Sequence, residues 1–269
     1  MELRFSPLFS GSSGNALYVG CDGAHLLVDA GVSGTRVAQS LAGIGVQPDE
    51  LNGILVTHEH IDHIRGIGVL SRKYDLPIFA TPGTWAAMSG KIGAVAEKNV
   101  RVFDPEVNFF MGPIEVVAFP TPHDAAEPVG FAFELDGARL AVATDIGCVR
   151  DSWAKYVLGA DAAVLESNYD PDMLDAGPYP YELKKRIRSR RGHLSNDDAG
   201  GFAVRLIEQG TRQIVLGHLS KENNFPELAL KCTECALRQA GIEPDQDARV
   251  CVAQRDMTTG IYSVRSEFR

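Results

Sequence analysis

The sequence lacks any apolar run near the ~18 residues that a membrane-spanning helix requires. Residues 1–5 also lack the apolar segment of a secretory signal peptide. With 45% hydrophobic and 23% charged residues, the composition excludes disordered and collagen-like classes. No stretch rich in proline, glycine or serine divides the chain. We therefore expect one globular domain over residues 1–269, located in the cytoplasm and not bound to a membrane.

Cysteine is scarce, and the five present are an odd number for a disulfide framework. Their thin spread is typical of a reducing compartment. Cys232 and Cys235 have the spacing of metal ligands, but no second pair accompanies them. They lie in a predicted helix over 226–240, so a buried structural role and a metal or redox role both stay open.

Positive charge is also scarce overall, since the net charge is −9, but it is concentrated in one place. Six of the eight residues in 184–191 are basic, and without these six the net charge would be −15. We call residues 184–191 the basic segment. A positive stripe on an acidic protein favours contact with a polyanion, although a solvated helix face explains such a run equally simply.

Apolar runs bounded by turn signals predict an α/β protein. The expected strands are 3–9, 16–19, 25–28, 53–56, 77–80, 100–103, 114–119, 129–135, 138–143, 162–165 and 213–216. The expected helices are 35–41, one starting near 64, one starting at 82, 180–189, 196–208 and 226–240. Each half of the chain has a strand followed by Asp and a later strand followed by His, which predicts two αβ halves whose sheets pack face to face.

A dense group of polar side chains follows the predicted strand 53–56. Residues 57–63 contain His58, His60, Asp62 and His63. In an extended loop, residues two apart point the same way, so His58 and His60 can bind one ion. Asp62 and His63 diverge from that direction and suit a second ion. Imidazole and carboxylate ligands without thiolate favour Zn²⁺, Mn²⁺ or Fe²⁺.

Three further candidate ligands follow strands elsewhere: His123, Asp145 and His218. If the strands pair, all three lie at one edge of a sheet, and the two oxygens of Asp145 allow it to bridge two ions. A single histidine after a strand is more often an ordinary hydrogen-bonded residue. Here, however, six of the seven histidines fall at strand ends or glycine-marked loops. The exception is His25, which has no assigned role.

The pattern His58-x-His60-x-Asp62-His63, followed by His123, Asp145 and His218, resembles the metallo-β-lactamase superfamily. The resemblance implies a four-layer αββα sandwich, with two mixed sheets face to face, helices outside and two metal ions at one edge. It assigns His58, His60 and His123 to one ion, and Asp62, His63 and His218 to the other, with Asp145 as the bridge. It also implies that Asp29 braces the histidine loop through hydrogen bonds.

Further motifs resemble the nuclease branches of this superfamily. Glu166 ends a predicted strand, and Gly192-His193-Leu194-Ser195-Asn196 precedes a helix, in an order similar to tRNA-processing nucleases. Together with the turn 9–15 and the segment 217–224, these motifs resemble the bacterial YycJ/WalJ family. That family is associated with 5′ to 3′ exonuclease activity on double-stranded DNA. The resemblance implies that Glu166 and His193 act near the leaving group.

The predicted reaction is hydrolysis of a phosphodiester by a hydroxide that bridges two Zn²⁺ or Mn²⁺ ions, and the resemblance favours DNA as the substrate. Asp62 is a further candidate for orienting the water. The predicted substrate-binding residues lie in the turn after the first strand, in the basic segment and after His193: Ser12, Ser13, Asn15, Lys184, Lys185, Arg188, Arg191 and Asn196.

Two rival functions remain. One is a small-molecule hydrolase using the same site, either a cyclic phosphodiesterase or a glyoxalase II-like thioesterase, which would not need the basic segment. The other is a metal-stabilised nucleic-acid-binding protein without catalysis. The native metal, the choice between DNA and RNA, the polarity and the oligomeric state stay open.

Overall fold

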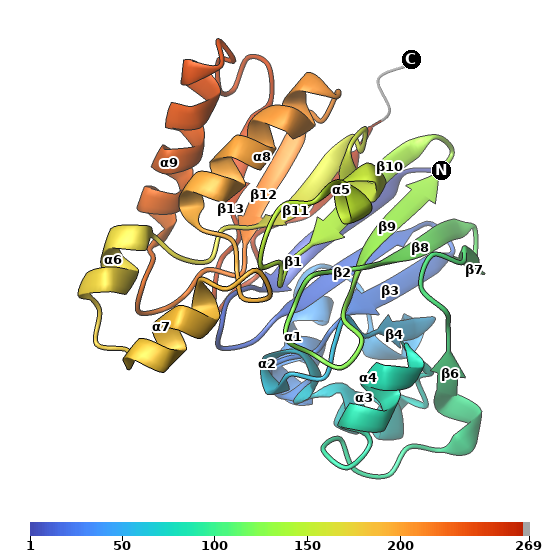
Figure 1. The fold of residues 1–269 in the computed structure, drawn as a ribbon. Helices are drawn as coiled ribbons and strands as arrows, with labels where there is room; N and C mark the ends of the chain where they lie inside the picture. The colour runs from blue at the N-terminus through green and yellow to red at the C-terminus, as the bar shows by residue number, and fades with distance from the viewer. Residues whose placement is uncertain (266–269) are drawn as a thin grey trace.

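The computed structural model describes residues 1–265 and contains two mixed sheets, shown in Figure 1. The first sheet has the order β14-β1-β2-β3-β4-β5-β6 and the second β13-β12-β11-β10-β9-β8-β7. The strands are β1 (Leu3–Phe9), β2 (Ala16–Cys21), β3 (Ala24–Val28), β4 (Gly53–Leu55), β5 (Ile78–Ala80), β6 (Val100–Val102), β7 (Phe109–Met111), β8 (Ile114–Pro120), β9 (Val129–Leu135), β10 (Ala138–Ala143), β11 (Ala162–Glu166), β12 (Gln213–Gly217), β13 (Arg249–Val252) and β14 (Tyr262–Val264).

Most helices lie on the outer faces of the two sheets, whereas α6 (Pro171–Ala176) and α7 (Tyr181–Ile187) lie beyond one end of the second sheet (Figure 1). The other helices are α1 (Gly34–Gly43), α2 (Ile61–Ile64), α3 (Ile67–Tyr74), α4 (Pro82–Met88), α5 (Asp151–Val157), α8 (Asn196–Glu208) and α9 (Pro226–Gln239). Short 3₁₀ turns occupy Pro48–Glu50 and Glu97–Asn99. Within residues 1–265, none of these helices has the length and apolar character needed to cross a membrane.

Three apolar clusters show why the strands form four layers. Alternate residues of a strand point to opposite faces, so Leu26 and Val28 enter the cluster between the sheets, whereas Leu27 packs under α1 and α3. In the second sheet Leu140 faces the inter-sheet cluster, and Ala141 packs beneath α5 and α8. Both sheets are thus buried on two faces, which confirms the predicted αββα sandwich.

Several elements differ from those predicted. Helices α5 and α6 and strands β7, β13 and β14 were not predicted. The helix expected near residue 64 is instead two helices, with α2 starting at Ile61. Strand β14 returns from the end of the chain to pair with β1, so the first sheet is not built from the first half alone. Of the single domain predicted over 1–269, residues 266–269 lie outside the described part.

The topology brings the strand ends that precede the candidate ligands to one edge. Strands β3 and β4 are parallel, as are β10, β11 and β12. Strand β8 is antiparallel to β9, which is antiparallel to β10, so β8 runs in the same direction as β10. The residues that follow β3, β4, β8, β10 and β12 therefore meet at one end of the sandwich.

Candidate metal centre

The histidine loop leaves β4 and is fixed by a carboxylate from the neighbouring strand. Asp29, directly after β3, accepts hydrogen bonds from Thr57 N (2.9 Å) and Thr57 Oγ (2.8 Å). The same carboxylate accepts from His63 Nδ1 at 2.8 Å. This supports the predicted bracing role of Asp29. Because α2 starts earlier than predicted, Asp62 and His63 lie on its first turn, whereas His58 and His60 precede it.

His58, His60 and His123 form the first group of candidate ligands. One ring nitrogen of each lies within 4.8 Å of those of the others. His123 Nδ1 donates to Gly192 O (3.0 Å), which leaves its Nε2 facing His60 Nδ1 at 3.3 Å. His58 Nδ1 lies 3.0 Å from the Thr57 hydroxyl, which itself donates to Asp29. Each histidine can therefore present a lone pair to the centre of the group.

Asp62, His63 and His218 form the second group, with ligand atoms within 4.8 Å of one another. Asp62 Oδ2 lies 3.7 Å from His63 Nε2 and 3.5 Å from His218 Nε2. Asp145 lies between the two groups. Its Oδ2 is 3.3 Å from His63 Nε2 and its Oδ1 is 3.6 Å from His123 Nε2. The structure thus brings all seven predicted ligands together at one end of the sandwich.

Three residues of the centre have left-handed backbone conformations. They are Asp29 (φ 60°), Asp145 (φ 57°) and His218 (φ 55°), each just after a strand. Residues other than glycine rarely adopt this conformation, and aspartate tolerates it better than most. Such backbone strain is typical of functional sites, where the surrounding structure holds it in place.

The donor set fits divalent cations. His58 Nε2, His218 Nε2 and Asp145 Oδ2 are buried atoms with no hydrogen-bond partner among residues 1–265. Leaving a buried polar atom unpaired costs about 1–3 kcal/mol, so three such atoms converging on one place indicate a missing partner. A cation satisfies all three, and nitrogen and oxygen donors without thiolate suit zinc or manganese.

The electrostatics of the centre also favour positive charge. Burial opposes the charged form of His63, but Asp145, Asp29 and Asp62 outweigh it and raise its pKa to about 9. His218 shows the same competition, and its pKa is raised well above the usual value, chiefly by Asp145. In Asp145, neighbouring histidines overcome burial and lower the pKa. The acidic side chains of the centre therefore favour positive charge on the groups beside them.

Glu166, at the end of β11, organises two histidines. Its Oε1 lies 2.7 Å from His193 Nδ1 and 2.8 Å from His218 Nδ1. Its Oε2 accepts from Ile146 N (2.8 Å) and Leu194 N (3.1 Å). Glu166 is fully buried, so the structure places it behind His193 and His218 as a residue that positions their rings. His193 is 19% exposed in its side chain, and it is the member of the pair that can meet a substrate.

The predicted substrate-binding residues fall into three sets. Ser12 and Ser13 are exposed on the turn after β1, whereas the Asn15 side chain contacts Asp62 O (3.4 Å) and His63 Nε2 (3.1 Å). For Asn196, the predicted contact with substrate is wrong. This residue is fully buried, accepts from Ser167 Oγ (2.7 Å) and donates to Asn224 Oδ1 (3.1 Å). Asn196 therefore stabilises the fold and is not available to a substrate.

The basic segment lies beside the candidate ligands. Arg186 pairs with Asp124, and Arg191 Nε donates to His123 O (3.1 Å). Lys184 and Arg188 contact α6, through Asp175 O (2.7 Å) and the Asp175 carboxylate respectively. Lys185 is exposed.

Sequence reasoning missed two residues that support this edge. Asn168 Nδ2 donates to His218 O (2.7 Å) and so fixes the backbone of a candidate ligand. Arg255 Nη2 donates to Leu219 O (2.9 Å) from a loop far along the chain. Asn168 lies two residues after Glu166 in a strand-end segment, which was a usable signal. The sequence around Arg255 offered none.

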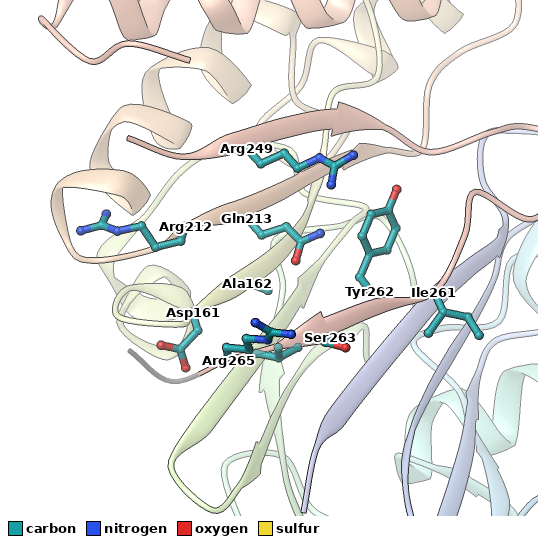
Figure 2. A pocket seen from close by; sticks show the side chains of 10 residues that line it. Asp161, Ala162, Arg212, Gln213, Arg249, Ile261, Tyr262, Ser263 and Arg265 are labelled. Carbon is teal, nitrogen blue, oxygen red and sulfur yellow. The ribbon is translucent and has the colours of Figure 1, made fainter. Parts of the chain in front are cut away.

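A separate pocket of about 380 Å³ lies at the opposite end of the second sheet (Figure 2). Asp161, Gln213 and Arg249 line it at the starts of parallel strands whose other ends carry the metal centre. Within residues 1–265, the groups of side chains able to hold a metal all lie away from this pocket. It is therefore not part of the candidate site.

Comparisons with known proteins agree with this geometry. Residues 25–219 match the family described as the beta-lactamase superfamily domain. The chain is 45% identical over 241 residues to the exodeoxyribonuclease YycJ of Bacillus anthracis, covering 90% of this chain and 91% of that protein. It is 39% identical over 263 residues to the exodeoxyribonuclease WalJ of Streptococcus pneumoniae, covering 97% and 98%.

Among solved structures, the metallo-β-lactamase fold protein YhfI of Bacillus subtilis superposes with a TM-score of 0.73 at 16% identity. The superposition covers 98% of this chain and 100% of that one, and at this identity it shows the fold alone. The fold, the seven converging side chains and the extended similarity to YycJ and WalJ lead to one assignment: the chain belongs to the metallo-β-lactamase superfamily of hydrolases, within the family of the YycJ and WalJ exodeoxyribonucleases.

Proposed function

We propose that this protein is a metal-dependent phosphodiesterase that removes nucleotides from DNA in the 5′ to 3′ direction. The observation that carries the proposal is the pair of ligand groups joined by Asp145, in a chain that is 45% identical to an exodeoxyribonuclease over nine tenths of its length. The proposal places the protein in the cytoplasm, with DNA as its partner. The five cysteines, all free, agree with a reducing compartment.

The proposed centre holds two divalent ions, either Zn²⁺ or Mn²⁺. His58, His60 and His123 would hold one ion, Asp62, His63 and His218 the other, and Asp145 would contact both. When bound, such a pair supplies an acidified water as nucleophile and neutralises charge on the phosphate. The carboxylate of Asp62 would also orient that water.

The protein's own residues would handle the leaving group. As the water oxygen joins phosphorus, the bond from phosphorus to the 3′ oxygen of the end nucleotide breaks, and that oxygen needs a proton. His193 is the candidate donor. Glu166 holds its Nδ1 at 2.7 Å, which leaves Nε2 as the nitrogen able to reach substrate.

The test is a nuclease assay on two ligand variants. In His60→Ala and Asp145→Asn we expect loss of Mn²⁺- or Zn²⁺-dependent cleavage of end-labelled duplex DNA. Asparagine tolerates the left-handed backbone at 145, so this change removes charge without a new backbone strain. His25→Gln is the matched control, because His25 lies on β3 and contacts Tyr18 Oη (2.7 Å), away from the centre.

Substrate choice separates the rival functions. The wild-type protein is offered duplex DNA, single-stranded DNA, RNA, a cyclic phosphodiester and a thioester. Shortening of duplex DNA from its 5′ end supports the proposal. Turnover of only the cyclic phosphodiester or the thioester would establish a small-molecule hydrolase, and full activity in either ligand variant would contradict the assigned site.

A further inference from the structure

Arg255 lies at the rim of the metal centre in an unusual setting. It follows β13, in the loop that leads to β14, and it is partly buried. Its Nη2 donates to Leu219 O (2.9 Å), and Leu219 directly follows the candidate ligand His218. Its Nη1 reaches Ser13 Oγ at 3.4 Å. A guanidinium carries five N–H donors, so these two contacts leave donors for another acceptor.

The Arg255 guanidinium has no anionic partner within residues 1–265. The adjacent Asp256 carboxylate is instead paired with Arg36, at 3.2 Å. Burial lowers the pKa of Arg255, because its charge is partly removed from water without a paired anion. Removing a charge from water is costly unless a counter-charge compensates, so this position is suited to receiving an anion.

The turn after β1 connects Arg255 to the metal ligands. Gly11 has a φ of 132°, and a Cβ there would lie 2.6 Å from Arg255 Nη1, so the missing side chain makes room for the guanidinium. Ser13 contacts Arg255, and Asn15 contacts both Asp62 and His63. A group held by Arg255 and the Ser13 hydroxyl would thus be separated from the centre only by this short turn.

We infer that Arg255 and Ser13 form a phosphate-binding subsite next to the metal centre. The inference rests on the proposed function, because DNA provides a second phosphate beside the one being cleaved. The ligand is either the 5′-terminal phosphate or a backbone phosphate. Arginine suits this role, since its planar fork matches phosphate oxygens and keeps its charge at every physiological pH.

The test uses Arg255→Gln, Arg255→Lys and Ser13→Ala on duplexes with a 5′-phosphate or a 5′-hydroxyl, in the presence of Mn²⁺. For Arg255→Gln we expect KM to rise about 10- to 100-fold, the effect of removing one charge-assisted hydrogen bond, with a small change in kcat. Arg255→Lys should recover part of this effect. Duplex binding measured by anisotropy in EDTA should weaken in parallel, which provides a readout without turnover.

Two controls separate the inference from simpler explanations. Arg36→Gln removes a neighbouring guanidinium that already has a carboxylate partner, and we expect unchanged KM. Hydrolysis of bis(p-nitrophenyl) phosphate reports on the metal centre alone, and we expect Arg255→Gln to retain it. A rise in KM only with the 5′-phosphate duplex identifies the terminal phosphate, and equal rises with both duplexes identify a backbone phosphate.

The inference is overturned if Arg255→Gln leaves KM and affinity unchanged for both duplexes. It is also overturned if the variant loses bis(p-nitrophenyl) phosphate hydrolysis together with DNA cleavage, because Arg255 would then only support the backbone at Leu219. Failure of the wild-type protein to cleave or bind DNA would instead contradict the proposed function, so the two failures are distinguishable.

Discussion

At the scale of single residues, Asp29 controls how the histidine loop faces the centre. Its carboxylate accepts three hydrogen bonds, two from Thr57 and one from His63 Nδ1. The last of these leaves His63 Nε2 as the nitrogen directed at Asp62 and Asp145. A buried carboxylate that fixes the tautomer of a ligand raises its basicity and its affinity for metal.

We therefore expect Asp29→Asn to bind Mn²⁺ or Zn²⁺ about 10- to 100-fold more weakly than wild type, since the amide is a poorer acceptor for His63. Asparagine can keep the left-handed backbone at this position, so the fold should persist. Isothermal titration with metal measures the affinity, and circular dichroism checks the fold. Asp22→Asn is the control, because Asp22 is an exposed residue paired with Arg4. Equal affinities for both variants would exclude the bracing role.

The ligand side chains could be predicted from the sequence because each follows an apolar strand, and the C-terminal ends of strands meet at one sheet edge. Buried polar residues were harder to predict. Asn196 looks like a surface residue before a helix, but its partner Asn224 lies 28 residues away. Arg255 reaches Ser13 across 242 residues. Contacts of this kind depend on how distant elements pack, so no local sequence pattern indicates them.

At the scale of elements, the exposure and positive charge of α7 indicate a ligand outside the protein. None of its residues is buried, so packing does not explain its sequence. It is held by contacts of its charged side chains: Arg186 pairs with Asp124 on one side, and Lys184 Nζ donates to Asp175 O of α6 (2.7 Å) on the other. Its remaining positive charge faces solvent near the proposed site of cleavage.

Neutralising that charge should weaken DNA binding but not chemistry on a small ester. For Lys185→Gln, which removes an exposed charge and no contact to α6, we expect a higher KM for duplex DNA and an unchanged rate with bis(p-nitrophenyl) phosphate. The slope of log affinity against log salt should decrease by about 0.9 for each phosphate that the variant no longer neutralises. Lys231→Gln on α9 is the matched control, because Lys231 pairs with Glu234 away from this edge. An unchanged slope would indicate a merely solvated helix face.

The elements that sequence patterns missed are short or half-exposed. Strands β13 and β14 have mixed burial, and β14 has only three residues, so neither shows a clear apolar run. Helix α6 spans six residues and buries only Leu174. Helix α5 buries Trp153 and two other residues within seven, too short a span for helical periodicity to stand out. Their places are fixed by pairing and packing with distant segments.

At the scale of the whole molecule, the cluster between the sheets joins the two halves. It contains Phe5 and Leu26 from the first sheet, and Phe131 and Val142 from the second. The candidate ligands come from segments that follow strands of both sheets, with Asp62 after β4 of the first and Asp145 after β10 of the second. A site shared in this way requires the sheets to keep a fixed relation, so the single domain proposed here has a functional reason.

A single domain should unfold in one cooperative transition. The two tryptophans can test this, because each reports on a different sheet. Trp85 on α4 packs against the cluster outside the first sheet, and Trp153 on α5 is buried outside the second. In Trp85→Phe and Trp153→Phe, each remaining tryptophan reports on one sheet. Within each variant, the urea midpoint from fluorescence should coincide with that from far-ultraviolet circular dichroism, whatever the stability cost of the substitution. If the two midpoints separate in either variant, the sheets unfold independently, and the inter-sheet cluster does not couple them.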